Sequence, residues 1–126
     1  MIAFEVTANG EKVCTAGVGK LGVLSAILSW VGREAPLKSP YSEELWPAEE
    51  LKLEVGGLAG NAKDGHENLK WMSGDLRPGD VITIRVLETD TADVPRLRKR
   101  EDPELVEKSK RAYYEQLRRE YGDAPA

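Results

Sequence analysis

Apolar and polar positions alternate in two short runs at the start of the chain. IAFEVTA and EKVCTAGV carry β-branched or aromatic residues at every second position, and Asn9-Gly10 lies between them. Asn-Gly supplies the positive φ angles that a two-residue hairpin turn requires. The pattern therefore predicts a β-hairpin in which residues 2–8 pair with residues 11–17.

The next apolar run, LGVLSAILSWVGRE, is compatible with two structures. In a helix, Leu24, Ile27 and Val31 form a core stripe, and the serines and glycines gather on the opposite side. In a strand, apolar residues occupy both faces and mix with serine on one of them. Because the helix separates polar from apolar residues better, we expect a packed helix over about residues 20–33.

Alternation returns after a loop, APLKSPYSEELWPAEE, which contains three prolines. The runs ELKLEVGGL, ENLKWM and VITIRVLE read as strands, separated by the turn sequences GNAKDG and DLRPGD. Trp30 and Trp71 are most simply core residues. Residues 1–88 are therefore expected to form one globular body.

The composition changes after Glu88. Residues 89–102 read as a linker that contains the basic cluster RLRKR. The segment DPELVEKSKRAYYEQLRREYG then predicts an amphipathic helix over residues 103–121, with Asp102 as its N-cap and Gly122 at its C-terminal end.

One side of this predicted C-terminal helix is apolar. Its narrow stripe comprises Val106, Tyr113, Leu117 and Tyr121. Leaving these side chains in water is unfavourable. We expect the stripe to be buried, either against the body or against a second subunit.

The order hairpin, helix, strand, short strand and final strand in residues 1–88 resembles the β-grasp, or ubiquitin-like, fold. The resemblance implies an α+β protein with a β-grasp-like mixed sheet, one packed helix at about 20–33 and the C-terminal helix at 103–121. If residues 22–32 form a strand instead, we expect an all-β, six-strand antiparallel sandwich with the C-terminal helix. Conjugated members of that family end in Gly-Gly, but this chain continues well past Glu88, so their chemistry is not expected here.

Composition and charge limit the cellular compartments and the classes of partner that we expect. The chain has 126 residues, a net charge of −4 and one cysteine, so no internal disulfide can form. The start shows no signal-peptide pattern, and the longest apolar run is too short to span a bilayer, so we expect a cytoplasmic protein without membrane contact. The acidic excess lies before residue 96, which argues against binding of a polyanion by the body.

Candidate catalytic residues are few. GVGK resembles the end of a phosphate-binding loop, but Cys14 and Leu21 stand where that loop requires Gly and Ser or Thr. A Cys14–His66 nucleophile pair remains as the basis of a small cysteine-dependent enzyme. The favoured interpretation is a packed strand thiol and an incidental loop histidine, with no catalytic, metal or cofactor site.

Interaction features are more numerous. Four glutamates flank Trp46 in the proline-rich loop, an arrangement suited to a basic protein partner. The leading hypothesis is a non-catalytic protein-interaction or adaptor module, with a protein partner or self-association through the C-terminal helix. Its candidate contact residues are Trp46, Glu43, Glu44, Tyr113, Leu117 and Tyr121. An alternative is a nucleic-acid-associated protein that uses Arg96, Arg98, Lys99 and Arg100.

Overall fold

The computed structural model describes residues 1–61, 65–100 and 103–122, which form β-sheet and one C-terminal helix. The strands make a three-stranded sheet of order β2-β1-β8, a four-stranded sheet of order β3-β6-β7-β9 and a small β4–β5 hairpin. The elements are β1 Ile2–Ala8, β2 Glu11–Ala16, β3 Gly22–Gly32, β4 Leu37–Lys38, β5 Leu45–Trp46, β6 Glu49–Asn61, β7 Gly65–Asp75, β8 Ile82–Glu88, β9 Leu97–Arg100 and α1 Pro103–Tyr121.

The predicted N-terminal hairpin is confirmed. β1 and β2 pair antiparallel, and the turn residues have the expected positive φ angles, 51° at Asn9 and 83° at Gly10. β8 pairs with the other edge of β1. The hairpin turn is joined to the turn before β8, because the backbone N–H of Asn9 donates to the carbonyl of Val81 (2.8 Å) and its side-chain amide donates to Asp80 (3.1 Å).

The helix expected at 20–33 is wrong, because residues 22–32 form strand β3. All eleven residues of β3 pair antiparallel with β6. Apolar side chains stand on both faces of this strand, which removes the period-two signal and leaves an accidental helical periodicity. The packed helix that the β-grasp resemblance implied is therefore absent at residues 22–32. All the strand pairings described are antiparallel, whereas that resemblance implied a mixed sheet. The alternative with a strand at 22–32 was correct on this element.

The two larger sheets pack face to face around a small core. Trp71 is 3% exposed, as the sequence predicted. The core draws on both sheets and comprises Val6, Cys14, Ala16, Leu53, Val55, Leu69 and Trp71. The proximal part of the molecule is therefore a β-sandwich.

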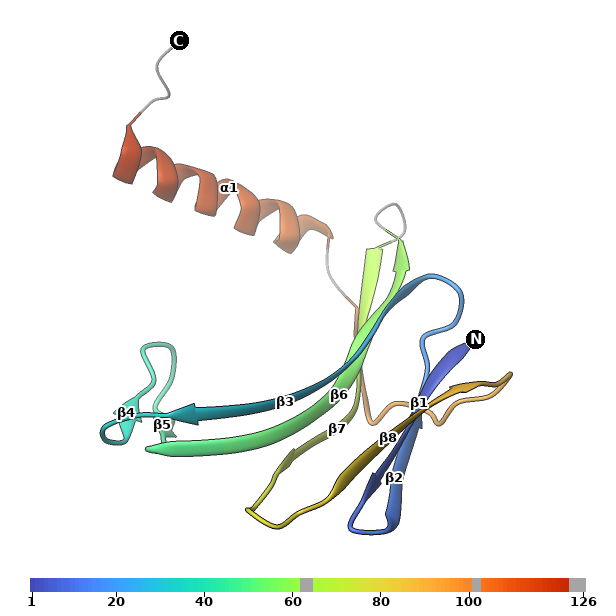
Figure 1. Ribbon diagram of the computed structural model, residues 1–126. Coiled ribbons are helices and arrows are strands. Elements are labelled where there is room, and N and C mark those ends of the chain that lie inside the picture. The colour runs from blue at the N-terminus through green and yellow to red at the C-terminus, as the bar shows by residue number, and fades with distance from the viewer. Residues whose placement is uncertain (62–64, 101–102, 123–126) are drawn as a thin grey trace.

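β3 and β6 continue beyond the three-stranded sheet as a curved arm that ends at the β4–β5 hairpin (Figure 1). On this arm the sandwich partner is missing. Leu28 is 61% and Trp30 is 63% exposed. The expectation that Trp30 is a core residue is therefore wrong.

The segment after Glu88 belongs to the body and is not a simple linker as far as Arg100. The backbone N–H of Thr89 donates to the carbonyl of Met1, and β9 adds a fourth strand beside β7. The basic cluster was expected to be solvated linker, but residues 97–100 of it form strand β9, which pairs with β7. Residues 101 and 102, including the predicted N-cap Asp102, lie outside the described residues.

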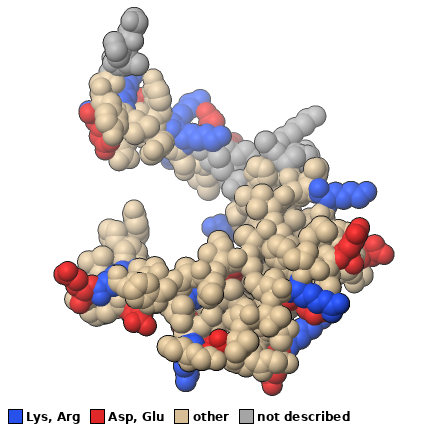
Figure 2. Space-filling view, in the orientation of Figure 1, with Lys and Arg blue, Asp and Glu red and all other residues tan. Residues whose placement is uncertain are grey.

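The C-terminal helix has the predicted boundaries, Pro103–Tyr121. It lies on the side of the arm opposite the three-stranded sheet, and open space separates it from the arm (Figures 1 and 2). Among the described residues, no helix combines the length and the apolar character needed to cross a bilayer.

Candidate interaction surface

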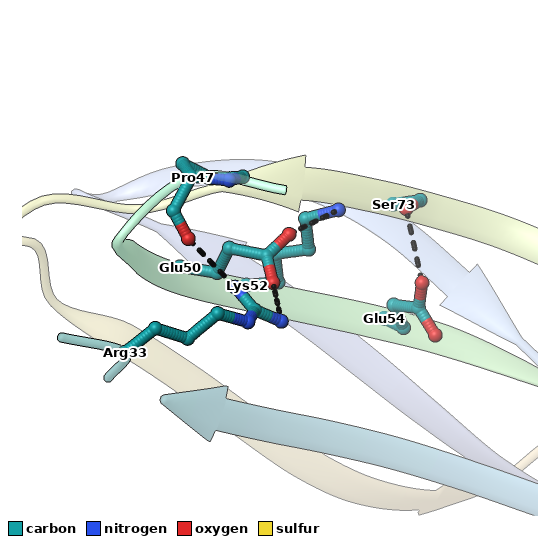
Figure 3. A network of polar contacts seen from close by, with 6 residues as sticks. All are labelled: Arg33, Pro47, Glu50, Lys52, Glu54 and Ser73. Carbon is teal, nitrogen blue, oxygen red and sulfur yellow. Dashed lines mark hydrogen bonds and ion pairs between the residues drawn. The ribbon is translucent and has the colours of Figure 1, made fainter. Parts of the chain in front are cut away.

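Arg33, the residue directly after β3, organises the tip of the arm (Figure 3). Its guanidinium donates to the carbonyl of Pro47 (2.7 Å) and forms an ion pair with Glu50 (2.8 Å). Glu50 also lies 3.7 Å from the ammonium of Lys52. Because the arginine and glutamate side chains are only 21% and 19% exposed, this pair is shielded and fixes the β4–β5 hairpin to the start of β6.

Trp46 is held by the same arginine. The guanidinium carbon of Arg33 lies 5.3 Å from the centroid of the indole ring, which is a cation–π contact. The Trp46 side chain is half-buried rather than fully offered to a partner. Sequence reasoning missed Arg33, because no local pattern connects it with residues more than ten positions away.

The two glutamates predicted beside Trp46 differ in their roles. The carboxylate of Glu43 is 95% exposed and lies 3.4 Å from the ammonium of Lys38. Glu44 contributes through its backbone, because its carbonyl accepts the N–H of Ser39 (2.9 Å). Both glutamates are exposed at the tip, and the backbone of Glu44 also shapes the hairpin.

Both faces of the arm are apolar. On the core-facing side, Leu28 and Trp30 stand opposite Leu53 and Leu51 of β6. Leu53 is buried in the core, whereas Leu28 and Trp30 on the edge strand are exposed. On the outer side, the exposed apolar residues of β3 are Val23, Ile27 and Val31. Large apolar side chains exposed on two faces of one ribbon are typical of a surface that another protein covers.

The outer face of the four-stranded sheet is also hollowed. An open hollow of about 460 Å³ has lining residues from all four strands, including Val23, Ile27, Leu58 and Leu97. Lys70 and Lys99 contribute the basic side of its lining and Glu54 an acidic group. The carboxylate of Glu54 accepts the hydroxyl of Ser73 (3.3 Å; Figure 3).

Two residues of the apolar stripe of α1, Tyr113 and Tyr121, are not buried within the chain, and the side chain of Val106 lies outside those described. Tyr113 is 63% and Tyr121 is 81% exposed, while Leu117 is half-buried. Of the two expected ways to bury the stripe, packing on the body is not seen for Tyr113 and Tyr121, and burial against a second subunit stays a prediction. The structure also does not bring Trp46 to the tyrosines of α1, because the helix stands apart from the β4–β5 hairpin (Figure 1).

The basic cluster is divided by the strand it forms. Successive side chains of β9 point to opposite faces, so Arg98 and Arg100 lie on one face and Lys99 lies on the other, in the outer hollow. Arg98 forms an ion pair with Glu67 at 3.5 Å. Arg96 precedes the strand and is exposed. The four cations therefore do not form one continuous basic face.

Cys14 and His66 lie on strands of different sheets, β2 and β7. Cys14 packs in the core as predicted, and burial, reinforced by the negative charge of Asp93, raises the pKa of its thiol. His66 was expected in a loop but lies near the start of β7, five residues from the core residue Trp71. A nucleophilic cysteine needs a lowered pKa and access to substrate, and Cys14 has neither.

Titratable groups elsewhere are scattered. Within the described parts of the chain, no group of three or more His, Cys, Asp or Glu residues is placed to hold a metal ion. No family model matches the chain, and neither a curated protein nor a solved structure matches it.

Proposed function

We propose that the protein is a non-catalytic protein-interaction module whose contact surface is the β3–β6 arm together with α1. The observation that carries the proposal is the exposure of Leu28 and Trp30 on the core-facing side of the arm. Full burial of a large apolar side chain is worth about 1.5–3 kcal/mol, and more than half of that remains available at each residue. A partner that covers the arm gains this free energy.

The tip of the arm supports the same proposal. The ion pair between Arg33 and Glu50 and the stacking of Arg33 on Trp46 hold the hairpin in one geometry before a partner arrives. A surface that is already ordered loses less conformational entropy on binding. In the proposal Trp46, Glu43 and Glu44 form the polar end of the contact surface.

The helix α1 provides the second part of the surface. Tyr113, Leu117 and Tyr121 offer an apolar stripe, and tyrosine combines a large contact area with a hydroxyl that tolerates water. The burial of the Cys14 thiol and its raised pKa support a role without catalysis.

Site-specific photo-crosslinking in the producing cell tests the proposal. A benzophenone amino acid replaces Leu28 on the arm or Tyr113 on α1, and a control carries it at Lys12, an exposed residue of β2. We expect adducts of discrete mass from positions 28 and 113 and none from position 12. Absence of adducts at both surface positions, or equal adducts at the control, would refute the proposal.

A further inference from the structure

The free edge of β3 lacks the usual protection against strand pairing. The edge strands of the two larger sheets, within the described chain, are β2, β8, β3 and β9. β2, β8 and β9 all carry charged residues, whereas β3 has eleven residues with no charge and no proline, and its pairing with β6 shows no bulge. Charges, prolines and bulges are the devices by which proteins prevent edge-to-edge association.

The sequence of β3 is also nearly symmetrical about its centre. GVLSAILSWVG reads in the same chemical order from both ends, with Ile27 in the middle. The equivalent positions are Gly22 and Gly32, Val23 and Val31, Leu24 and Trp30, Ser25 and Ser29, and Ala26 and Leu28. A two-fold interface requires such self-complementarity, because residue i of one copy meets residue j of the other and the reverse.

We infer that two copies of this chain associate by antiparallel pairing of their β3 edges about a two-fold axis at Ile27. The inference rests on the proposed function and names its partner as a second copy of the chain. The two four-stranded sheets then join into one continuous eight-stranded sheet. The unpaired N–H and C=O groups along the β3 edge acquire hydrogen-bond partners, as in other cases of strand addition.

The register of this pairing is specified by the side chains. In the central register Val23 faces Val31 and Ser25 faces Ser29, so apolar residues meet apolar residues and the hydroxyls meet each other. A shift of two residues places a serine opposite Ile27. A shift of one residue sets the outer face of one copy level with the core-facing side of the other, so the two copies no longer present equivalent faces on the same side of the joined sheet.

Charges beyond the strand ends agree with the same register. Lys20 precedes β3 by two positions and Glu34 follows it by two, and both are exposed. The central register places Lys20 of each copy at the position that matches Glu34 of the other copy. Opposite charges therefore flank both ends of an uncharged paired strand, which favours antiparallel over parallel association.

Charge reversal at the axis tests the inference on the full chain. Ile27 is 53% exposed in the monomer, so I27K and I27E should leave the fold intact, and circular dichroism is the check. Sedimentation equilibrium of the wild type should give twice the chain mass of 13.9 kDa. Each single variant places two like charges face to face, and we expect its dimer dissociation constant to rise by about 100-fold.

The decisive measurement is a mixture of the two variants. An equimolar mixture of I27K and I27E should recover the dimer, because residue 27 meets only residue 27 of the other copy. The control V86K alters an exposed apolar residue of β8, an edge strand of the other sheet, and should leave the dimer unchanged. Recovery in the mixture together with an unchanged control supports the pairing.

Three results overturn the inference. They are a wild type that stays monomeric at about 100 µM chain, a dimer that survives I27K, and a dimer that fails to return in the mixture. The proposed function is judged separately by the crosslinked products. Adducts with other proteins at position 28 and a monomeric wild type would retain the interaction module while rejecting self-pairing.

Discussion

Asp93 joins the two sheets, and replacing it separates a hydrogen-bond effect from a charge effect. Its carboxylate accepts the backbone N–H of Thr15 (2.7 Å), and its carbonyl accepts the indole N–H of Trp71 (2.7 Å). Thr15 is 8% exposed, so its buried N–H loses its acceptor in D93A. D93N keeps an oxygen at that position and loses only the charge.

The expected destabilisation follows from these contacts. A hydrogen bond to a charged group contributes about 1.5–3 kcal/mol, and the exposure of Asp93 places the D93A effect near the lower end, about 1–2 kcal/mol. A chain of this length has an unfolding entropy of about 0.26 kcal/mol/K, so D93A should lower Tm by about 4–8 °C. D93N should lower Tm by less than half as much.

The same two variants should affect the pKa of the Cys14 thiol equally, although they affect Tm unequally. The charge of Asp93 contributes, after burial, to the raised pKa of Cys14. Both D93A and D93N remove that charge, so both should lower the pKa of the thiol by similar amounts. Thiolate absorbance during a pH titration measures the pKa, and thermal unfolding measures Tm. The control D90A alters an exposed aspartate of the same segment and should leave both quantities unchanged.

Two results would refute this reasoning. If D93N lowers Tm as much as D93A, the hydrogen bond to Thr15 is not the source of the stability. If the pKa of Cys14 stays constant in both variants, the carboxylate does not act on the thiol through its charge.

Three further predictions concern the core, a turn and the helix. L53A removes most of a side chain that is 1% exposed and should cost about 2–5 kcal/mol in urea unfolding, whereas L21A, at an exposed position, should cost less than about 0.5 kcal/mol. The backbone N–H of Arg77 and the Asn9 amide lower the pKa of Asp80 in the folded protein. The ionised carboxylate therefore stabilises the folded state above the ordinary Asp pKa, and this stabilisation is lost as the pH falls through the lowered pKa. D80N should therefore lose less stability than the wild type on acidification below about pH 4, and parallel acid curves would contradict this. Truncation after Arg100 keeps β9 and should change the Tm of the body by less than about 2 °C, and a larger fall would show that α1 packs on the sheets.

The elements with strong local signals were predictable from the sequence. Asn9-Gly10 determined the first hairpin, and Pro103 and Gly122 marked the ends of α1. β3 was not predictable, because its structure depends on pairing with a strand that begins many residues later. A run that is apolar on both faces carries no local information that separates strand from helix.

The candidate surface was predicted only in part. Trp46 and Glu43 do lie at the exposed tip of the arm, but Arg33, which holds Trp46, carried no sequence signal. The exposure of Trp30 was missed, because aromatic residues in apolar runs are usually buried. Burial depends on the distance that the arm extends past the other sheet, and this is a property of tertiary structure.

The pairing of β1 with β8 has a consequence for the order of events during synthesis. Ile2 lies opposite Glu88, so the three-stranded sheet closes only after nearly the whole body has left the ribosome. Until then the β1–β2 hairpin is an isolated two-strand ribbon, which is marginally stable in water. The β3–β6 and β6–β7 pairings span shorter loops and cost less closure entropy. Loop-closure entropy therefore favours pairing of β3, β6 and β7 before β8 completes the three-stranded sheet.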